Sequence, residues 1–226
     1  MTTENIGVKY PQQVPVLESQ SLTIPDGLAE DLDALVSDGG LDVILAVDCS
    51  GSTVGHRPSL VHFCERSEQL LDAHGAGLTV FGFDDCLYPL KDRGEPGQFE
   101  HLLRIGAGGT PTQHAVAQAR LEADKSGAKH RLILVHTDGA TANPDALHGQ
   151  IAGALQDGHL FGCIGWGVGY DSNPVSKQYG DTYVNGEVEG EFAALAQILS
   201  RQIVGPEVVA LPAVLPPTAA IIDPRR

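Results

Sequence analysis

The sequence predicts an α/β fold in which a doubly wound, mostly parallel central sheet is flanked by helices. Short continuous apolar runs alternate with longer segments whose apolar residues recur at helical spacing. Such continuous runs are typical of strands that are buried on both faces. The chain has 226 residues, of which 42% are hydrophobic, and this suits one domain with a real core.

The first buried strand is predicted at 41–48, in the run LDVILAVD. The edge strand at 86–91 tolerates Pro89 because an edge position needs no second hydrogen-bonded neighbour. Asn143 and Pro144 are an expected cap and first residue of a helix. The remaining elements, in chain order, are a helix at 59–75, a strand at 77–85, the edge strand, a short helix at 98–107, a helix from 110–112 to 127, a strand at 130–139, a helix at 143–158, a strand at 159–169, and a short strand and a last helix within 181–204.

Three regions of different composition are expected. Residues 1–40 form a polar, proline-punctuated N-terminal extension with one amphipathic stretch, GLAEDLDALVSDG, that suits a short helix. Whether this extension folds onto the domain, predicted at 41–204, is left open. Residues 205–226 carry five prolines and cannot form a regular helix, so an extended C-terminal tail is expected, lying on the surface or reaching for a neighbour.

Charge and composition exclude several classes of partner. The formal net charge of −15 leaves no surplus of Lys and Arg to neutralise phosphates, so neither nucleic acid nor an anionic membrane surface is expected as a partner. No stretch has the pattern of a signal peptide or the length of a membrane span. The four cysteines are scattered without a C-x-x-C pair, which indicates reduced thiols and a cytoplasmic protein.

Polar oxygen-bearing residues follow the predicted strands where a doubly wound sheet binds ligands, at the carboxyl edge. Two serines alternate with an aspartate in DCSGS, and hydroxyls and a second carboxylate follow in GAGGTPT and HTDG. Carboxylate and hydroxyl oxygens favour a hard divalent cation. Two aspartates acting through water would leave the ion substantially positive and open to a carboxylate from outside. The candidate ligands are Asp48, Ser50, Ser52, Thr110 and Asp138.

These residues resemble the metal-ion-dependent adhesion site of von Willebrand factor A domains, which have a Rossmann-like fold. DCSGS, the threonine of GGT and the aspartate of TDG fill all five expected positions in the family order, and the similarity covers residues 41–204. The resemblance implies a protein-interaction module in which Mg²⁺ bridges to an acidic residue of the partner. Mn²⁺ and Ca²⁺ are alternatives, although few carboxylates argue against tight Ca²⁺ binding. GGTPT and TDGA are most similar to bacterial and phage versions found beside MoxR-type AAA+ ATPases and metal-chelatase subunits.

Other residues near these loops have alternative possible roles. Thr112 competes with Thr110 as a ligand, and Thr110 also suits a helix cap. Thr112, Asp84 and His136 are also candidates for supporting the site from behind the ligands. Trp166 is either a core or rim aromatic or an anchor for a partner, because Trp is enriched where binding energy concentrates. For the DCSGS loop alone, a turn with local backbone caps is the competing explanation.

Three functions remain open. The first is a non-enzymatic, metal-dependent adaptor, indicated by a full set of oxygen ligands without a nucleophile–base pair. An AAA+ ATPase or its substrate is the expected partner of such an adaptor. The second is a metal-assisted hydrolase or phosphoryl-transfer enzyme with Asp48 as nucleophile, which is disfavoured because no lysine follows to hold a phosphate. The third is a structural or self-assembling protein in which the tail docks on another copy.

Overall fold

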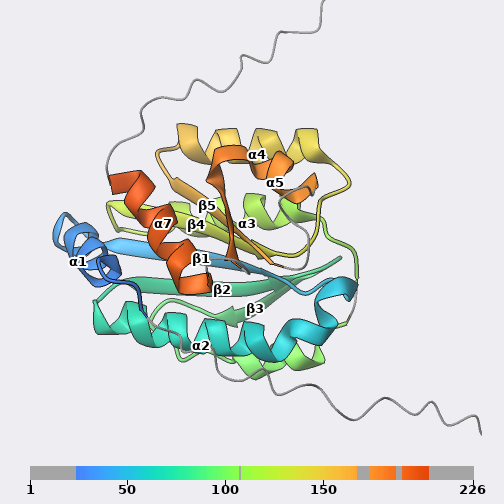
Figure 1. Ribbon diagram of the computed structural model, residues 1–226, viewed down its shortest axis with the longest axis horizontal. Helices are drawn as coiled ribbons and strands as arrows, with labels where there is room; N and C mark the ends of the chain where they lie inside the picture. Colours follow the sequence, from blue (N-terminus) through green and yellow to red (C-terminus); the bar gives the residue numbers. More distant parts are fainter. Residues whose placement is uncertain (1–23, 107, 167–173, 187–189, 204–226) are drawn as a thin grey trace, which may run out of the picture.

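A computed structural model describes residues 24–106, 108–166, 174–186 and 190–203. Its six-stranded sheet has the order β3-β2-β1-β4-β5-β6 (Figure 1). Strands β2 and β3 pair antiparallel, and the other neighbouring strands pair in parallel. The predicted doubly wound, mostly parallel sheet is therefore confirmed. The strands are β1 (Leu41–Asp48), β2 (Gly77–Phe83), β3 (Leu87–Lys91), β4 (His130–Thr137), β5 (Leu160–Gly165) and β6 (Tyr183–Asn185).

Helices cover both faces of the sheet and enclose two hydrophobic cores. The first core lies beneath α1, α2 and α7, and the second beneath α3, α4 and α5. None of the helices in the described ranges is long and apolar enough to cross a membrane. The helices are α1 (Leu28–Ser37), α2 (Arg57–Ala73), α3 (Thr112–Asp124), α4 (Pro144–Gln156), α5 (Pro174–Tyr179) and α7 (Glu191–Ile203).

Strand β1 lies at the centre of the sheet, and all eight of its residues are buried. Its side chains alternate between the two cores: Val43 and Leu45 belong to the first, Ile44 and Ala46 to the second. Both faces of the strand therefore need apolar residues, which is why the sequence shows a continuous apolar run rather than an alternating pattern.

Helix α1 packs onto the domain, which answers the question that the sequence left open for the end of the extension. Its Leu28, Leu32 and Leu35 are buried in the first core. Asp38, which follows the helix, forms an ion pair with Lys129 at 2.7 Å. The expected boundaries at 41 and 204 stay predictions, and residues 1–23 and the whole expected tail, 205–226, lie outside the described residues.

Some local expectations were wrong. The strand predicted at 77–85 ends at Phe83, and the helix predicted at 98–107 is a shorter 3₁₀ helix, η2 (Phe99–Arg104). A second 3₁₀ helix, η1 (Gly51–His56), follows β1 directly, and it and α5 were not predicted. Short 3₁₀ turns carry too few residues to show a period in the sequence. The expected cap at Asn143 is confirmed, because its side chain accepts a hydrogen bond from the Ala146 amide at 3.1 Å.

Candidate metal centre

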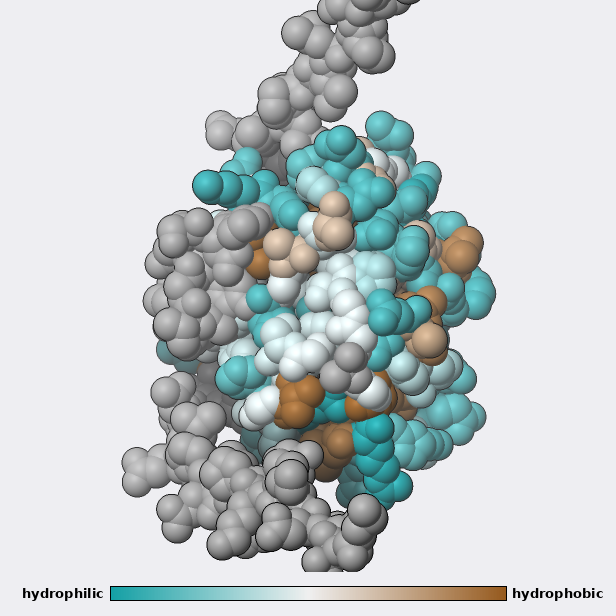
Figure 2. All heavy atoms as spheres, turned by 90° about the vertical axis from the view of Figure 1, so that its right-hand side faces the viewer, coloured by the Kyte–Doolittle hydropathy of each residue, from teal (hydrophilic) through white to brown (hydrophobic). Residues whose placement is uncertain are grey.

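The loops that carry the candidate ligands meet at one edge of the sheet. Strands β1 and β4 are parallel neighbours, with Val47 opposite His136, so their carboxyl ends lie together. Strand β1 lies between β2 and β4, so the strand order runs in opposite directions on its two sides. The carboxyl end of β1 is therefore at the topological switch point of the sheet. The edge lies at the right of Figure 1 and faces the viewer in Figure 2, where pale residues of near-neutral hydropathy gather at the centre.

A chain of short hydrogen bonds links four of the candidate ligands across two loops. The Ser50 amide donates to Oδ1 of Asp48 at 2.8 Å. The hydroxyls of Ser50 and Ser52 lie 3.1 Å apart, and the Ser52 hydroxyl donates to Oδ1 of Asp138 at 2.8 Å. The oxygens of both serines and both aspartates thus form one continuous cluster.

Thr110 approaches the same cluster at Gly139. A Cβ on Gly139 would lie 3.2 Å from Oγ1 of Thr110 and 3.6 Å from Oδ2 of Asp48. Glycine at this position leaves room for the threonine hydroxyl beside the buried carboxylate. The structure therefore brings all five candidate ligands to one place.

The Asp48 carboxylate is buried and hydrogen-bonded at the centre of this cluster. Its side chain is fully buried, and Oδ2 accepts a hydrogen bond from the Thr137 hydroxyl at 2.5 Å. Burial raises the pKa of Asp48 to about 6, against the lowering effect of the hydrogen bonds from Thr137 and Ser50. Within the described ranges, no Lys or Arg forms an ion pair with Asp48. A buried carboxylate in this state is stabilised when a cation binds beside it.

Arg57, which the sequence analysis did not single out, ties the ligand loops together. Its buried guanidinium donates to the carbonyls of Cys49 at 3.0 Å and Gly106 at 2.6 Å, and to that of Ile105. The Gly51 amide adds a bond to the Gly108 carbonyl at 3.1 Å. The loop after β1 and the loop before α3 are thus held against each other. The sequence did contain one signal for the role of Arg57. The helix dipole disfavours a cation at the first residue of a helix, so an arginine there indicates a specific contact.

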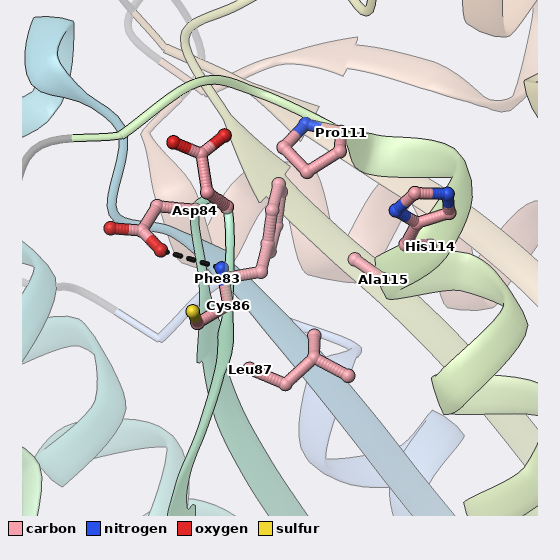
Figure 3. A pocket seen from close by; sticks show the side chains of 8 residues that line it. Phe83, Asp84, Cys86, Leu87, Pro111, His114 and Ala115 are labelled. Atoms are coloured by element: carbon pink, nitrogen blue, oxygen red, sulfur yellow. Dashed lines mark hydrogen bonds between the residues drawn. The ribbon is translucent and has the colours of Figure 1, made fainter.

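Of three further residues expected near the site, one contacts a candidate ligand and two make their described contacts elsewhere. Thr112 is fully buried at the start of α3, and its amide donates to the Thr110 carbonyl at 2.9 Å. Asp84 accepts a hydrogen bond from the Cys86 amide at 2.8 Å (Figure 3) and another from the Tyr88 hydroxyl at 2.9 Å. His136 lies 2.9 Å from Oε1 of Glu191, at the start of α7. Their supporting roles stay predictions.

Trp166 lies at the same edge, directly after β5. Its amide donates to the Thr137 carbonyl at 3.0 Å, and its half-buried ring meets the His56 ring edge-on, with centroids 3.6 Å apart. This position beside η1 is compatible with a rim aromatic and with a contact for a partner.

The donor set fits a hard divalent cation. It consists of two carboxylates and three hydroxyls, without thiol or imidazole, and such oxygens suit Mg²⁺ and Mn²⁺. In the described part of the chain, no group of three or more His, Cys, Asp or Glu side chains is placed to hold a metal. Any cation held at this edge therefore depends on the hydroxyls as much as on the carboxylates.

No family model and no curated protein matches the chain at the level of sequence. Solved structures match it in fold. The vWF domain of the type V pili tip protein Mfa5 from Porphyromonas gingivalis is 13% identical, with a TM-score of 0.57, over 74% of this chain and 96% of that domain. The pilus adhesin SpaC from Lactobacillus rhamnosus GG is 15% identical, with a TM-score of 0.54, over 73% of this chain and 29% of SpaC.

A third matching structure holds a metal. Manganese-loaded TRAP protein from Plasmodium vivax is 15% identical, with a TM-score of 0.51, over 70% of this chain and 74% of that one. Identities this low carry the fold alone. Together with the six-stranded, mostly parallel sheet and its two helical layers, these matches show that the chain has the Rossmann-like α/β fold of von Willebrand factor A domains.

Proposed function

We propose that this protein is a non-enzymatic interaction module that binds another protein through a divalent cation. The observation that carries the proposal is the cluster of oxygens from three loops around the buried carboxylate of Asp48. Mg²⁺ is the proposed ion, with Mn²⁺ as the first alternative.

The ligands have separate tasks in this proposal. The hydroxyls of Ser50, Ser52 and Thr110 face the ion, and the carboxylates of Asp48 and Asp138 hold it directly or through water. When bound, the ion supplies a positive charge that attracts a carboxylate from the partner. The chain's own contribution is to hold the loops in place, through Arg57 and the Gly51 amide, and to leave the ion incompletely neutralised.

The matched structures support an interaction role. They include a pilus adhesin, a pilus tip protein and a manganese-loaded protein, all with this fold. An AAA+ ATPase as the partner stays a prediction from the sequences of the GGTPT and TDGA loops. The cytoplasm as the location stays a prediction from the scattered cysteines. A hydrolase remains the alternative of another class, with Asp48 as its nucleophile. Self-assembly remains the other alternative.

Affinity capture tests the proposal. Immobilised wild-type protein is expected to retain a partner in Mg²⁺ and release it in EDTA, and Asp48→Ala is expected to retain none while keeping a native circular dichroism spectrum. Asp85→Asn is the matched control, because it removes an exposed carboxylate beside the Thr110 loop but outside the oxygen cluster. Retention that chelation leaves unchanged contradicts the proposal, and metal-dependent phosphatase turnover abolished by Asp48→Asn favours the enzyme.

A further inference from the structure

A groove lies between α3 and the antiparallel edge of the sheet, on the side away from α2. It consists of two adjoining hollows of about 380 Å³ and 230 Å³, which share Leu87. The residues that α3 contributes, from Pro111 to Glu122, follow at helical spacing along one side of that helix. We call this the edge groove, and Figure 3 shows its upper hollow, with Phe83, Leu87 and Ala115 at its wall.

The edge groove exists because α3 leaves the outer strand uncovered. On this face α3 packs chiefly over β1 and β4, whereas β3 lies at the end of the sheet. Leu87 on β3 consequently remains 41% exposed, and Pro89 is exposed beside it. The groove therefore offers apolar surface over about 17 Å, the length that eleven helical residues span, which matches five or six residues of an extended chain.

The rim of the edge groove is acidic. Asp85 lies at its upper end, against Gly108 and Gly109, and Asp92 lies at its lower end. Both side chains are exposed, and neither forms an ion pair with another described residue. Glu122, in contrast, is already paired with Lys125 at 2.8 Å. The occupant that this lining favours is extended and apolar, with a positive charge that meets one of these two aspartates.

The chain's own C-terminal segment has this chemistry. Residues 221–226 read IIDPRR, with two isoleucines, one aspartate, a proline that favours an extended backbone, and two adjacent arginines that outweigh the aspartate in charge. We propose that this segment occupies the edge groove of the same molecule. The isoleucines cover the exposed Leu87 and Pro89, and the arginines lie at one acidic end of the groove.

The connection is long enough for docking within one chain. The last described residue is Ile203, so residues 204–220 form the link. At about 3.1 Å per residue these residues span roughly 53 Å, whereas a domain of this size is about 40 Å across. A tethered segment also acts at an effective concentration near millimolar, which favours its own groove over that of another copy. The inference does not depend on metal binding, so it can fail or hold separately from the proposed function.

Cys86 provides a native probe inside the groove. It lines the upper hollow and is exposed, whereas Cys49, Cys64 and Cys163 are buried. A photoactivatable maleimide on Cys86 of the full chain is expected to cross-link to residues 221–226, as read by mass spectrometry. In a mixture of ¹⁴N- and ¹⁵N-labelled protein, the cross-linked peptides are expected to carry one label only.

Matched tail variants complete the test. Ile221→Asp with Ile222→Asp is expected to reduce the cross-link at least about tenfold and to speed alkylation of Cys86, because two apolar side chains lose their burial. Val208→Asp with Val209→Asp, in the link, is expected to change neither. Cross-links that lie elsewhere, that join two copies, or that persist in the isoleucine variant overturn the proposal.

Discussion

Ser52, in the loop after β1, donates its hydroxyl to Oδ1 of Asp138, in the loop after β4, at 2.8 Å. This bond joins residues that are 86 positions apart and connects the two sides of the oxygen cluster. The Ser50 and Asp48 contacts extend it to the buried carboxylate, so the cluster behaves as one network rather than as separate turns.

The pH dependence of stability reports on Asp48. Burial raises its pKa to about 6 in the folded protein, above the usual value near 3.9 in an unfolded chain. The folded state therefore binds more protons than the unfolded state in this window, and the free energy of unfolding falls as pH rises from about 4 to 6. As the pH rises through this window, the free energy of unfolding of the metal-free wild type is expected to fall by about 3 kcal/mol relative to that of Asp48→Asn. Urea unfolding in EDTA measures this difference. Parallel pH curves for the two proteins would contradict the burial argument.

Metal binding is expected to raise thermal stability at neutral pH. A cation that binds only the folded state, at a hundred times its Kd, adds about 2.7 kcal/mol, which corresponds to a rise in Tm of roughly 5–10 °C in a domain of this size. At pH 5 the rise is expected to shrink because Asp48 must lose a proton before the ion binds. Differential scanning fluorimetry with Mn²⁺ and Mg²⁺ measures this. An equal rise in Asp48→Asn would mean that the ion binds elsewhere.

A side chain at Gly139 is expected to displace Thr110 and thereby weaken metal binding. In Gly139→Ala the new methyl group meets Thr110 at 3.2 Å, so the threonine must shift away from Asp48. We expect Mn²⁺ affinity to fall at least about tenfold, while unfolding changes by only about 1 kcal/mol. Gly149→Ala is the control, because an added Cβ there meets nothing within 4 Å. Unchanged affinity in Gly139→Ala would place Thr110 outside the site.

Arg57 is expected to matter for both folding and metal affinity. Arg57→Met removes the donors to the carbonyls of Cys49, Ile105 and Gly106, and leaves them without these bonds. The expected loss in the free energy of unfolding is about 2–4 kcal/mol. Metal affinity is expected to fall as well, because the two ligand loops lose their connection. Arg66→Met, on α2, removes a hydrogen bond to the Gln69 side chain that lies away from the ligand loops, and it is expected to change neither quantity.

The sheet could be predicted because its signal is local. Each buried strand shows a continuous apolar run, and the ligand loops follow at the strand ends, so their meeting at one edge follows from the parallel topology. The role of Arg57 could not be predicted, because its carbonyl partners come together only in the folded chain. The contact of His136 was missed for the same reason: its partner, Glu191, lies 55 residues later on α7. His136 lies within β4, whereas Asp138, two residues later, lies beyond the end of that strand.

The most direct measurement of the central claim is a titration of Mn²⁺ followed by electron paramagnetic resonance. The wild-type protein is expected to bind one Mn²⁺, and Ser50→Ala with Ser52→Ala is expected to bind at least about tenfold more weakly while remaining folded. Mg²⁺ is expected to compete for the same site. A wild-type protein that leaves Mn²⁺ free, or a double variant that binds it equally well, would contradict the claim that these hydroxyls hold a cation.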